Sequence, residues 1–225
     1  MGILQTKKTE TDEKTIDFTL VKSRNLLVIF TRNPELGKCK TRLAEKVGDE
    51  AALDIYQFLL NHTVKITFGL YAKKTVYYSE EICKEDIWNN TVYDKKLQTG
   101  QDLGERMANA FLEGFQNDFE KIIVIGSDMY DLSQKDLEAA FNALDTNDFV
   151  VGPAEDGGYY LLGMKHFIPE VFQAKNWGTV TVLQDTLSNL VAEKTALLAS
   201  KNDVDHYEDI KDIEAFAPFL KHMRL

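Results

Sequence analysis

The chain has 225 residues, of which 44% are hydrophobic and 28% are charged, proportions typical of a soluble globular protein. Its formal net charge of -10 argues against a nucleic acid as the main partner, because a phosphate backbone requires a broad basic face. The longest apolar runs are far shorter than the roughly 20 residues that span a bilayer, and the amino terminus has no apolar signal segment. We therefore expect a cytoplasmic protein that neither spans a membrane nor binds nucleic acid.

Apolar strands and amphipathic helices alternate along the chain after a polar, weakly patterned stretch at residues 1–23. We interpret that stretch as an extension and residues 24–225 as one domain. Strands are expected at residues 26–31, 75–78, 91–97, 121–126, 149–152, 159–163 and 195–199. Helices are expected at residues 49–68, 103–119, from 133 onward, 180–192, and 208–220 with an interruption near Pro218. This alternation predicts an α/β fold, a three-layer α/β/α sandwich around a mostly parallel mixed sheet.

A basic loop, residues 31–43, follows the first predicted strand. Gly37 permits a tight bend in it. Its cations are Arg32, Lys38, Lys40 and Arg42. A loop with glycine and cations after a strand is suited to a polyphosphate, since ligands gather at the carboxyl ends of the strands in such sheets. The alternative is a solvated loop that pairs with the acidic surface.

Carboxylates follow two other predicted strands. Asp128 comes directly after the buried strand at residues 121–126, and Asp203 and Asp205 follow the last strand. Mg²⁺ commonly takes only one or two protein carboxylates together with waters and phosphate oxygens, so these acids are candidate metal ligands. The alternatives are that Asp128 is a turn or cap residue and that the second pair lies in an acidic loop that caps the final helix.

The stretch from residue 149 to 163 holds the most distinctive motif. Between its two strands stand Glu155, Asp156, Gly157 and Gly158, and Tyr159 follows them. A simple hairpin needs only one Asp-Gly or Asn-Gly pair, so the additional acid and glycine suggest a site at the strand ends.

Two weaker candidates complete the set. Residues 99–106 form a glycine-rich start of a helix, where an anion would be attracted near Asp102 and Arg106, although Asp102 could equally be the helix N-cap. Trp177 lies in a Trp-Gly-Thr sequence that would shape a substrate site, although tryptophan is more often a packing residue.

Six motifs occur in the order that is typical of one known family. They are Gly-Lys-Cys-Lys-Thr-Arg-Leu at 37–43, Asp-Leu-Gly-Glu-Arg-Met at 102–107, Gly-Ser-Asp at 126–128, Gly-Pro-Ala-Glu-Asp-Gly-Gly-Tyr-Tyr-Leu-Leu-Gly at 152–163, Trp-Gly-Thr at 177–179 and Asp-Val-Asp at 203–205. Over about residues 25–215 the chain resembles the radical-SAM/selenodomain-associated transferase 1 family, often labelled a glycosyltransferase. Its members resemble the glycosyltransferase-A fold of the nucleotide-diphospho-sugar transferase superfamily.

The resemblance implies a role for each motif and makes residues 24–225 a nucleotide-binding transferase domain. The cations of the basic loop would hold the phosphates of the nucleotide, Asp128 would bind the metal, and Asp203 or Asp205 would close the metal site. Asp156 and the two glycines after it would line the acceptor or sugar side.

The sequence therefore predicts a Mg²⁺- or Mn²⁺-dependent transferase that takes a nucleotide or nucleotide-sugar donor and an unknown small-molecule acceptor. A glycosyltransferase is favoured, with Asp156 orienting or deprotonating the acceptor. One alternative is a nucleotidyltransferase that releases pyrophosphate. A second is a nucleotide-binding module without turnover, favoured by Met129 and Tyr130, which stand where the family usually has a small residue and a proline. The oligomeric state is not indicated.

Overall fold

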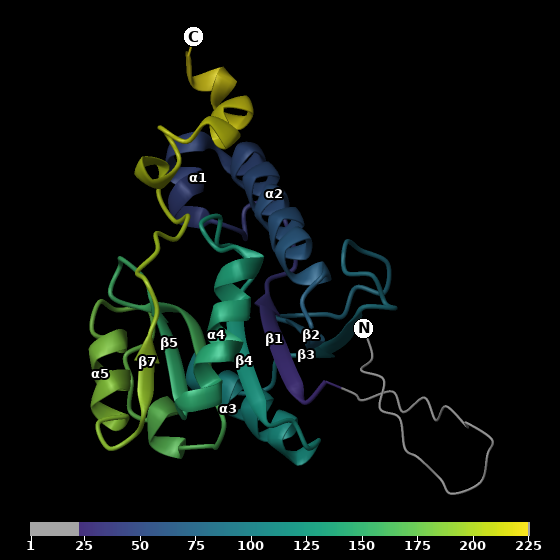
Figure 1. The fold of residues 1–225 in the computed structure, drawn as a ribbon. Helices are drawn as coiled ribbons and strands as arrows, with labels where there is room; N and C mark the ends of the chain where they lie inside the picture. The colour runs from purple at the N-terminus through teal and green to yellow at the C-terminus, as the bar shows by residue number, and fades with distance from the viewer. Residues whose placement is uncertain (1–22, 225) are drawn as a thin grey trace, which may run out of the picture.

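A computed structural model describes residues 23–224, and a seven-stranded sheet forms their centre (Figure 1). The strands are β1 (Asn25–Thr31), β2 (Lys73–Tyr78), β3 (Tyr93–Leu97), β4 (Lys121–Gly126), β5 (Phe149–Pro153), β6 (Tyr159–Met164) and β7 (Thr195–Leu197). Their order across the sheet is β3-β2-β1-β4-β6-β5-β7. Only β6 runs antiparallel to its neighbours in this part of the chain, which confirms the mostly parallel mixed sheet.

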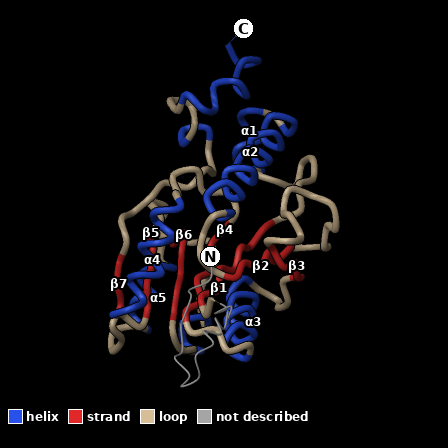
Figure 2. Tube along the Cα trace, turned by 45° about the vertical axis from the view of Figure 1, so that its right-hand side comes forward, coloured by secondary structure: helices blue, strands red, loops and turns tan. Residues whose placement is uncertain are grey.

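Helices cover both faces of the sheet (Figure 2). The α-helices are α1 (Thr41–Val47), α2 (Asp49–Phe68), α3 (Leu103–Gln116), α4 (Gln134–Thr146) and α5 (Val182–Asn189), and the 3₁₀ helices are η1 (Pro169–Phe172), η2 (Tyr207–Asp209) and η3 (Glu214–Arg224). Helices α2 and α4 pack on one face, and α3, α5 and η1 pack on the other. The three-layer α/β/α sandwich is thereby confirmed. No helix between residues 23 and 224 is long and apolar enough to cross a bilayer.

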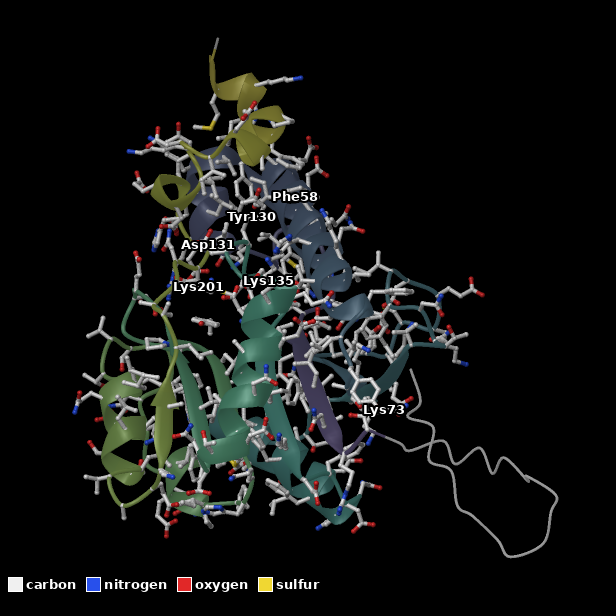
Figure 3. All side chains as sticks on the ribbon, in the orientation of Figure 1. Phe58, Lys73, Tyr130, Asp131, Lys135 and Lys201 are labelled. Atoms are coloured by element: carbon white, nitrogen blue, oxygen red, sulfur yellow. The ribbon has the colours of Figure 1, made fainter. Side chains whose placement is uncertain are left out.

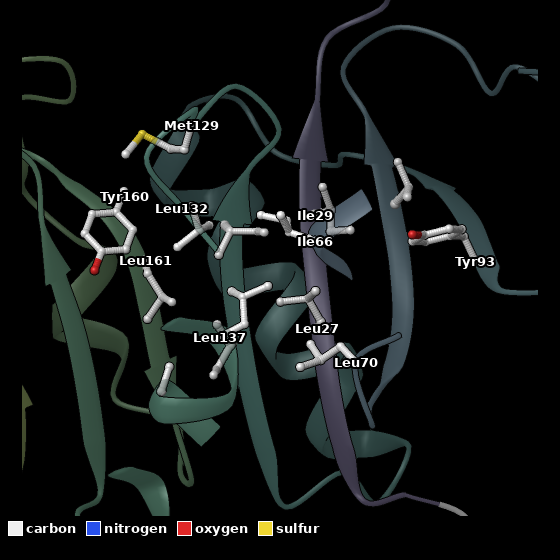
Figure 4. Packing of buried hydrophobic residues seen from close by; sticks show 14 of the residues in the cluster. Leu27, Ile29, Ile66, Leu70, Tyr93, Met129, Leu132, Leu137, Tyr160 and Leu161 are labelled. Atoms are coloured by element: carbon white, nitrogen blue, oxygen red, sulfur yellow. The ribbon is translucent and has the colours of Figure 1, made fainter. Parts of the chain in front are cut away.

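The core forms because strand side chains alternate between the two faces. On β1, Leu27 and Ile29 enter the cluster beneath α2 and α4, whereas Leu26 and Val28 enter the opposite cluster. Figure 4 shows Leu27 beside Leu137 of α4 in the first cluster. A full aliphatic side chain that is buried in this way contributes about 1.5–3 kcal/mol. These two clusters fix the strand ends from which the candidate site is built.

A third cluster lies beyond the carboxyl edge of the sheet, where α1, the start of α2 and η3 pack together (Figure 1). Val47, Ile55 and Phe216 are among its fully or almost fully buried members. This cluster holds the carboxyl-terminal end of the basic loop in place, because α1 begins within that loop and packs in the cluster.

Two expectations need correction. Helix α1 occupies residues that we expected to be loop. The final helix expected at residues 208–220 is replaced by η2 and η3. The carboxylate of Asp209 accepts hydrogen bonds from the backbone N–H groups of Asp205 and His206, at 2.9 and 2.6 Å. Pro218 has no N–H to donate, so a regular α-helix cannot continue through residues 208–220. Other elements begin or end within a few residues of the predicted bounds. The expected extension lies outside the described residues except for Ser23.

Candidate active site

Two adjoining pockets open at the carboxyl edge of the sheet. The larger, of about 890 Å³, we call the basic cavity, because it is lined by Arg32, Lys38, Lys40, Arg42 and Arg106. The smaller, of about 230 Å³, we call the acidic pocket, because it is lined by Asp128, Asp156 and Asp203. Asp128 and Asp156 line both, so the two pockets meet at these carboxylates.

Lys40 joins the basic loop to Asp128 and Asp205 through ion pairs. Its Nζ lies 2.6 Å from Asp128 Oδ2 and 3.1 Å from Asp205 Oδ1, and its side chain is only 6% exposed. Arg42 binds the other oxygen of Asp205 at 3.1 Å. Burial acts to lower the pKa of Lys40, but the charges of Asp128 and Asp205 outweigh it and hold that pKa above its ordinary value. The lysine is therefore a fixed positive charge in the wall of the basic cavity.

The backbone of Lys40 is strained. Its φ of 49° and ψ of 48° place it in the left-handed region, where a residue with a Cβ is uncommon. Such conformations cost of order 1–3 kcal/mol and persist where surrounding structure holds them, often at functional sites. Here Ala44 N donates to Lys40 O at 2.8 Å to begin α1, and the two carboxylates hold the side chain.

A buried hydroxyl network lies beneath the basic cavity. Tyr56 OH donates to Arg32 O at 3.1 Å and accepts Arg32 N–H at 2.9 Å. It also lies 3.3 Å from Thr31 Oγ1 and 3.4 Å from Ser127 Oγ. This network ties the ends of β1 and β4 together and so fixes Arg32 relative to Asp128. Tyr56 was not among the residues predicted for the site; the signal that could have found it is that the hydroxyl of a buried tyrosine usually has a polar partner.

Asp156 and Gly158 of the Glu-Asp-Gly-Gly turn line the acidic pocket, whereas Gly157 lines neither pocket. Asp156 Oδ1 accepts the N–H of Gly158 at 2.8 Å. Gly157 has a φ of 90°, and a Cβ on it would stand 2.3 Å from Val180 O. Leu183 N donates to Gly157 O at 3.0 Å. A simple turn would not need this close approach, so the contact with the segment that follows Trp177 is what requires glycine at position 157.

Asp203 lines the acidic pocket but is not bonded to Lys40. Burial, and then the charges of Asp156 and Asp205, raise its pKa to about 6. Between residues 23 and 224 no three His, Cys, Asp or Glu side chains converge as a preformed metal site. The carboxylates of Asp128 and Asp205 nevertheless reach one common cation, the ammonium of Lys40. Their hard oxygen atoms suit Mg²⁺ or Mn²⁺, so this pair fits a metal shared with a diphosphate.

Other predicted residues separate into those that line the pockets and those that do not. Arg106 lines the basic cavity, where Gly100 O and Gln98 Oε1 hold its guanidinium at 3.2 and 3.3 Å. Asp102 instead caps α3 by accepting Glu105 N at 2.8 Å, and it lines neither pocket. Its position matches the N-cap alternative.

Gly37, Lys38 and Glu155 lie at the edge of the site or outside it. Gly37 bends the basic loop with a φ of 74° and lines neither pocket. Lys38 reaches the basic cavity from its rim and pairs with Glu35 at 2.9 Å. Glu155 is exposed, lines neither pocket, and joins the structure through its N–H to Lys201 O at 3.1 Å.

The two predicted aromatic residues line the acidic pocket. Trp177 packs on Gly104, where a Cβ would stand 2.6 Å from its ring. Tyr159 lines the same pocket, and its hydroxyl lies 3.9 Å from Met107 Sδ. Because Gly104 leaves room for the ring, the Trp-Gly-Thr sequence and the start of α3 together shape the pocket wall.

Met129 and Tyr130 point into different parts of the structure. Met129 is buried and lines the acidic pocket. Tyr130 packs among aromatic rings of the third cluster, with ring centroids 5.8 Å from Phe58 and 5.0 Å from Phe216 (Figure 3). The tyrosine therefore does not line either pocket.

Comparison with known proteins places this site in context. Residues 71–179 match the model of a family described as "Uncharacterized protein conserved in bacteria (DUF2064)". The chain is similar to a "putative nucleotide-diphospho-sugar transferase" from Desulfovibrio desulfuricans G20, with 28% identity, a TM-score of 0.77, and coverage of 90% of this chain and 96% of that chain. No curated protein matches the chain.

More distant solved structures share the fold. A 4-diphosphocytidyl-2C-methyl-D-erythritol synthase from Anaerococcus prevotii DSM 20548 has 11% identity and a TM-score of 0.54, covering 86% of this chain and 99% of that chain. A cytidylyltransferase from Leptospira borgpetersenii has 13% identity and a TM-score of 0.51, covering 90% and 94%. The fold expected from the sequence, that of nucleotide-diphospho-sugar transferases, is thereby confirmed.

Proposed function

We propose that this protein is a metal-dependent transferase that uses an activated nucleotide, and specifically a glycosyltransferase whose donor is a nucleotide sugar. The likeness to the Desulfovibrio protein supports an enzyme of the transferase class. The observation that carries the proposal is the meeting of Lys40 with Asp128 and Asp205 on the wall of the basic cavity. We further propose membership of the radical-SAM/selenodomain-associated transferase 1 family and a cytoplasmic location.

The basic cavity would hold the diphosphate of the donor. Lys40, Arg32 and Arg106 present positive charge to it, and charge-assisted hydrogen bonds to phosphate are about twice as strong as neutral ones. Asp128 and Asp205 would hold Mg²⁺ or Mn²⁺, with Asp203 beside them. When bound, the metal would neutralise negative charge on the diphosphate leaving group.

Asp156 would act on the acceptor. It lines both pockets, so it stands at the boundary between the proposed donor and the proposed acceptor. Its Oδ1 accepts the Gly158 N–H, which orients the carboxylate. The carboxylate can then hold the acceptor hydroxyl and receive its proton as the new bond forms.

Calorimetry tests the metal and phosphate assignments together. ADP, CDP, GDP and UDP are each titrated into the protein with and without Mn²⁺. We expect at least one to bind at least tenfold more tightly with the metal. Asp128→Asn should abolish that difference, because it removes a charged metal ligand. Asp131→Asn is the matched control, since Asp131 is exposed nearby and lines neither pocket (Figure 3).

Turnover separates the three candidate functions. Release of nucleoside diphosphate from a nucleotide sugar supports glycosyl transfer. Release of pyrophosphate from a nucleoside triphosphate and a phosphorylated substrate would support nucleotidyl transfer instead. Metal-dependent binding with no product from any donor would leave a binding module. An Asp128→Asn variant that keeps full metal-dependent affinity would contradict the proposed site itself.

A further inference from the structure

The two pockets share the carboxylates of Asp128 and Asp156 but differ in their cations. The acidic pocket carries the carboxylates of Asp128, Asp156 and Asp203, and no lysine, arginine or histidine is among the described residues that line it. Every cation of the basic loop lines the basic cavity instead. The cation bonded to the shared acid Asp128 is Lys40, whose ammonium is also engaged by Asp205.

The rest of the acidic pocket is largely apolar. Its wall is formed by the side chains of Leu103, Met129, Tyr159, Trp177 and Val182. Leu103 is 44% exposed although it is a large apolar residue. Such a wall offers stacking and apolar contact to a ligand that also reaches the carboxylates.

These two properties select among acceptors. A phosphate monoester carries about 1.5 to 2 negative charges near pH 7 and needs positively charged or N–H partners. In the acidic pocket it would face three carboxylates, while the Lys40 ammonium and the proposed metal at Asp128 are already engaged by Asp205 and the donor diphosphate, and no other cation lines the described part of the pocket. A hydroxyl or amine has the opposite match, because it donates hydrogen bonds to carboxylates.

We propose that the acceptor is a phosphate-free molecule, neutral or positively charged, that presents a hydroxyl or amine from an apolar body. This rests on the proposed glycosyl transfer. The acceptor oxygen or nitrogen forms a bond to the anomeric carbon, and the bond from that carbon to the diphosphate oxygen breaks. The bonding electrons leave with the nucleoside diphosphate, and the proton of the acceptor passes to Asp156.

Matched probes test the acceptor class. Ligand-observed NMR is used to measure binding of 2-phenylethanol, 2-phenylethylamine and 2-phenylethyl phosphate, with Mg²⁺ and a saturating nucleoside diphosphate that occupies the basic cavity. We expect the alcohol and the amine to bind at least tenfold more tightly than the phosphate. Phosphate binding equal to that of the alcohol, or no binding by either phosphate-free probe, overturns the proposal.

Variants locate the probes. Trp177→Ala should weaken the alcohol and the amine at least fivefold, and Trp177→Phe should restore most of the affinity. Leu103→Ala gives a second test in case Trp177→Ala fails to fold, since an exposed leucine contributes little to stability. Because Leu103 lines both pockets, the affinity of this variant for the nucleoside diphosphate is measured alongside. Probe binding that is unchanged in Leu103→Ala and in Trp177→Ala overturns the assignment to this pocket.

The same samples separate this proposal from the proposed function. If the diphosphate does not bind but the alcohol binds through Trp177, the proposed donor site fails and the pocket preference stands. If the diphosphate binds with Mg²⁺ but the phosphate ester is the best probe, the acceptor proposal fails. That second result would favour nucleotidyl transfer to a phosphorylated substrate.

Discussion

Two cavities of similar size lie at opposite edges of the sheet. The basic cavity, of about 890 Å³, is at the carboxyl ends of the strands. The other, of about 840 Å³, is at the amino ends of β1 and β2 and also contains several lysines and acids. Size and charged residues alone therefore do not distinguish a candidate site from a surface hollow.

The pairing of the charges does distinguish them. At the amino edge, Lys73 pairs with Asp94 at 2.7 Å and Lys96 pairs with Glu113, and all four side chains are substantially exposed. Exposed pairs of this kind contribute only about 0–1 kcal/mol. At the carboxyl edge, the buried Lys40 joins carboxylates from two distant parts of the chain, with a strained backbone of its own. Long-range convergence on one buried charge is what marks the basic cavity.

Removing cations from each cavity gives the largest expected contrast. Lys40→Ala combined with Arg42→Ala should weaken nucleoside diphosphate binding by about 3 kcal/mol or more, since each charged hydrogen bond contributes roughly 1.5–3 kcal/mol. Lys73→Ala combined with Lys96→Ala should leave the affinity within error. Calorimetry at constant salt measures both. Equal losses in the two double variants would mean that the basic cavity is not the phosphate site.

Replacing each of two glycines of the site by alanine gives the next largest contrast, in the free energy of unfolding. Gly157→Ala should lower the free energy of unfolding by about 2–3 kcal/mol, because it combines a positive φ with a Cβ 2.3 Å from Val180 O. Gly178→Ala shares the positive φ but has no atom within 4 Å of its added Cβ, so it should cost about 1 kcal/mol. Urea unfolding measures both. Identical losses would show that the turn does not press against the segment after Trp177.

Much of the fold could be predicted from the sequence because most strands are short apolar runs that alternate with helical patterns. The run at residues 122–125 is fully apolar, and it forms the buried centre of β4. Helix α1 was missed because it is only seven residues long and begins inside the basic loop, whose glycine and cations are typical of a loop. A disturbance near Pro218 was expected, but the replacement of the final helix by η2 and η3 was not, because apolar spacing does not reveal the local capping by the carboxylate of Asp209.

The candidate site was only partly predictable. Position after a strand correctly brought Lys40, Asp128 and Asp205 to one edge of the sheet. Their mutual ion pairs join residues up to 165 positions apart, and no local pattern contains that information. For the same reason, the hydrogen bond between Tyr56 and Arg32 required coordinates. The cap formed by Asp102 is local, and the sequence already offered it as one of two alternatives.

Replacing one acid at each edge of the sheet gives the smallest expected difference, a difference in the free energy of unfolding. Asp136 accepts the N–H and hydroxyl of Ser133 at the start of α4 and lies 3.1 Å from Lys201 Nζ. Burial acts to raise the pKa of Asp136, but the hydrogen bonds from Ser133 and the charge of Lys201 outweigh it and lower that pKa. Asp136→Ala should therefore cost about 1–2 kcal/mol at pH 7, in the range of a lost helix cap.

The pH dependence follows from the sign of that shift. Because the folded-state pKa of Asp136 lies below the unfolded value of about 3.9, its stabilisation is fully present above that value and is lost as the pH falls through the folded-state pKa. Wild type and Asp136→Ala should thus converge in strongly acidic urea unfolding series. At the amino edge, Asp94→Ala breaks only an exposed pair with Lys73 and should cost less than about 0.5 kcal/mol at any pH. A larger loss for Asp94→Ala than for Asp136→Ala would reverse the contrast between the two edges.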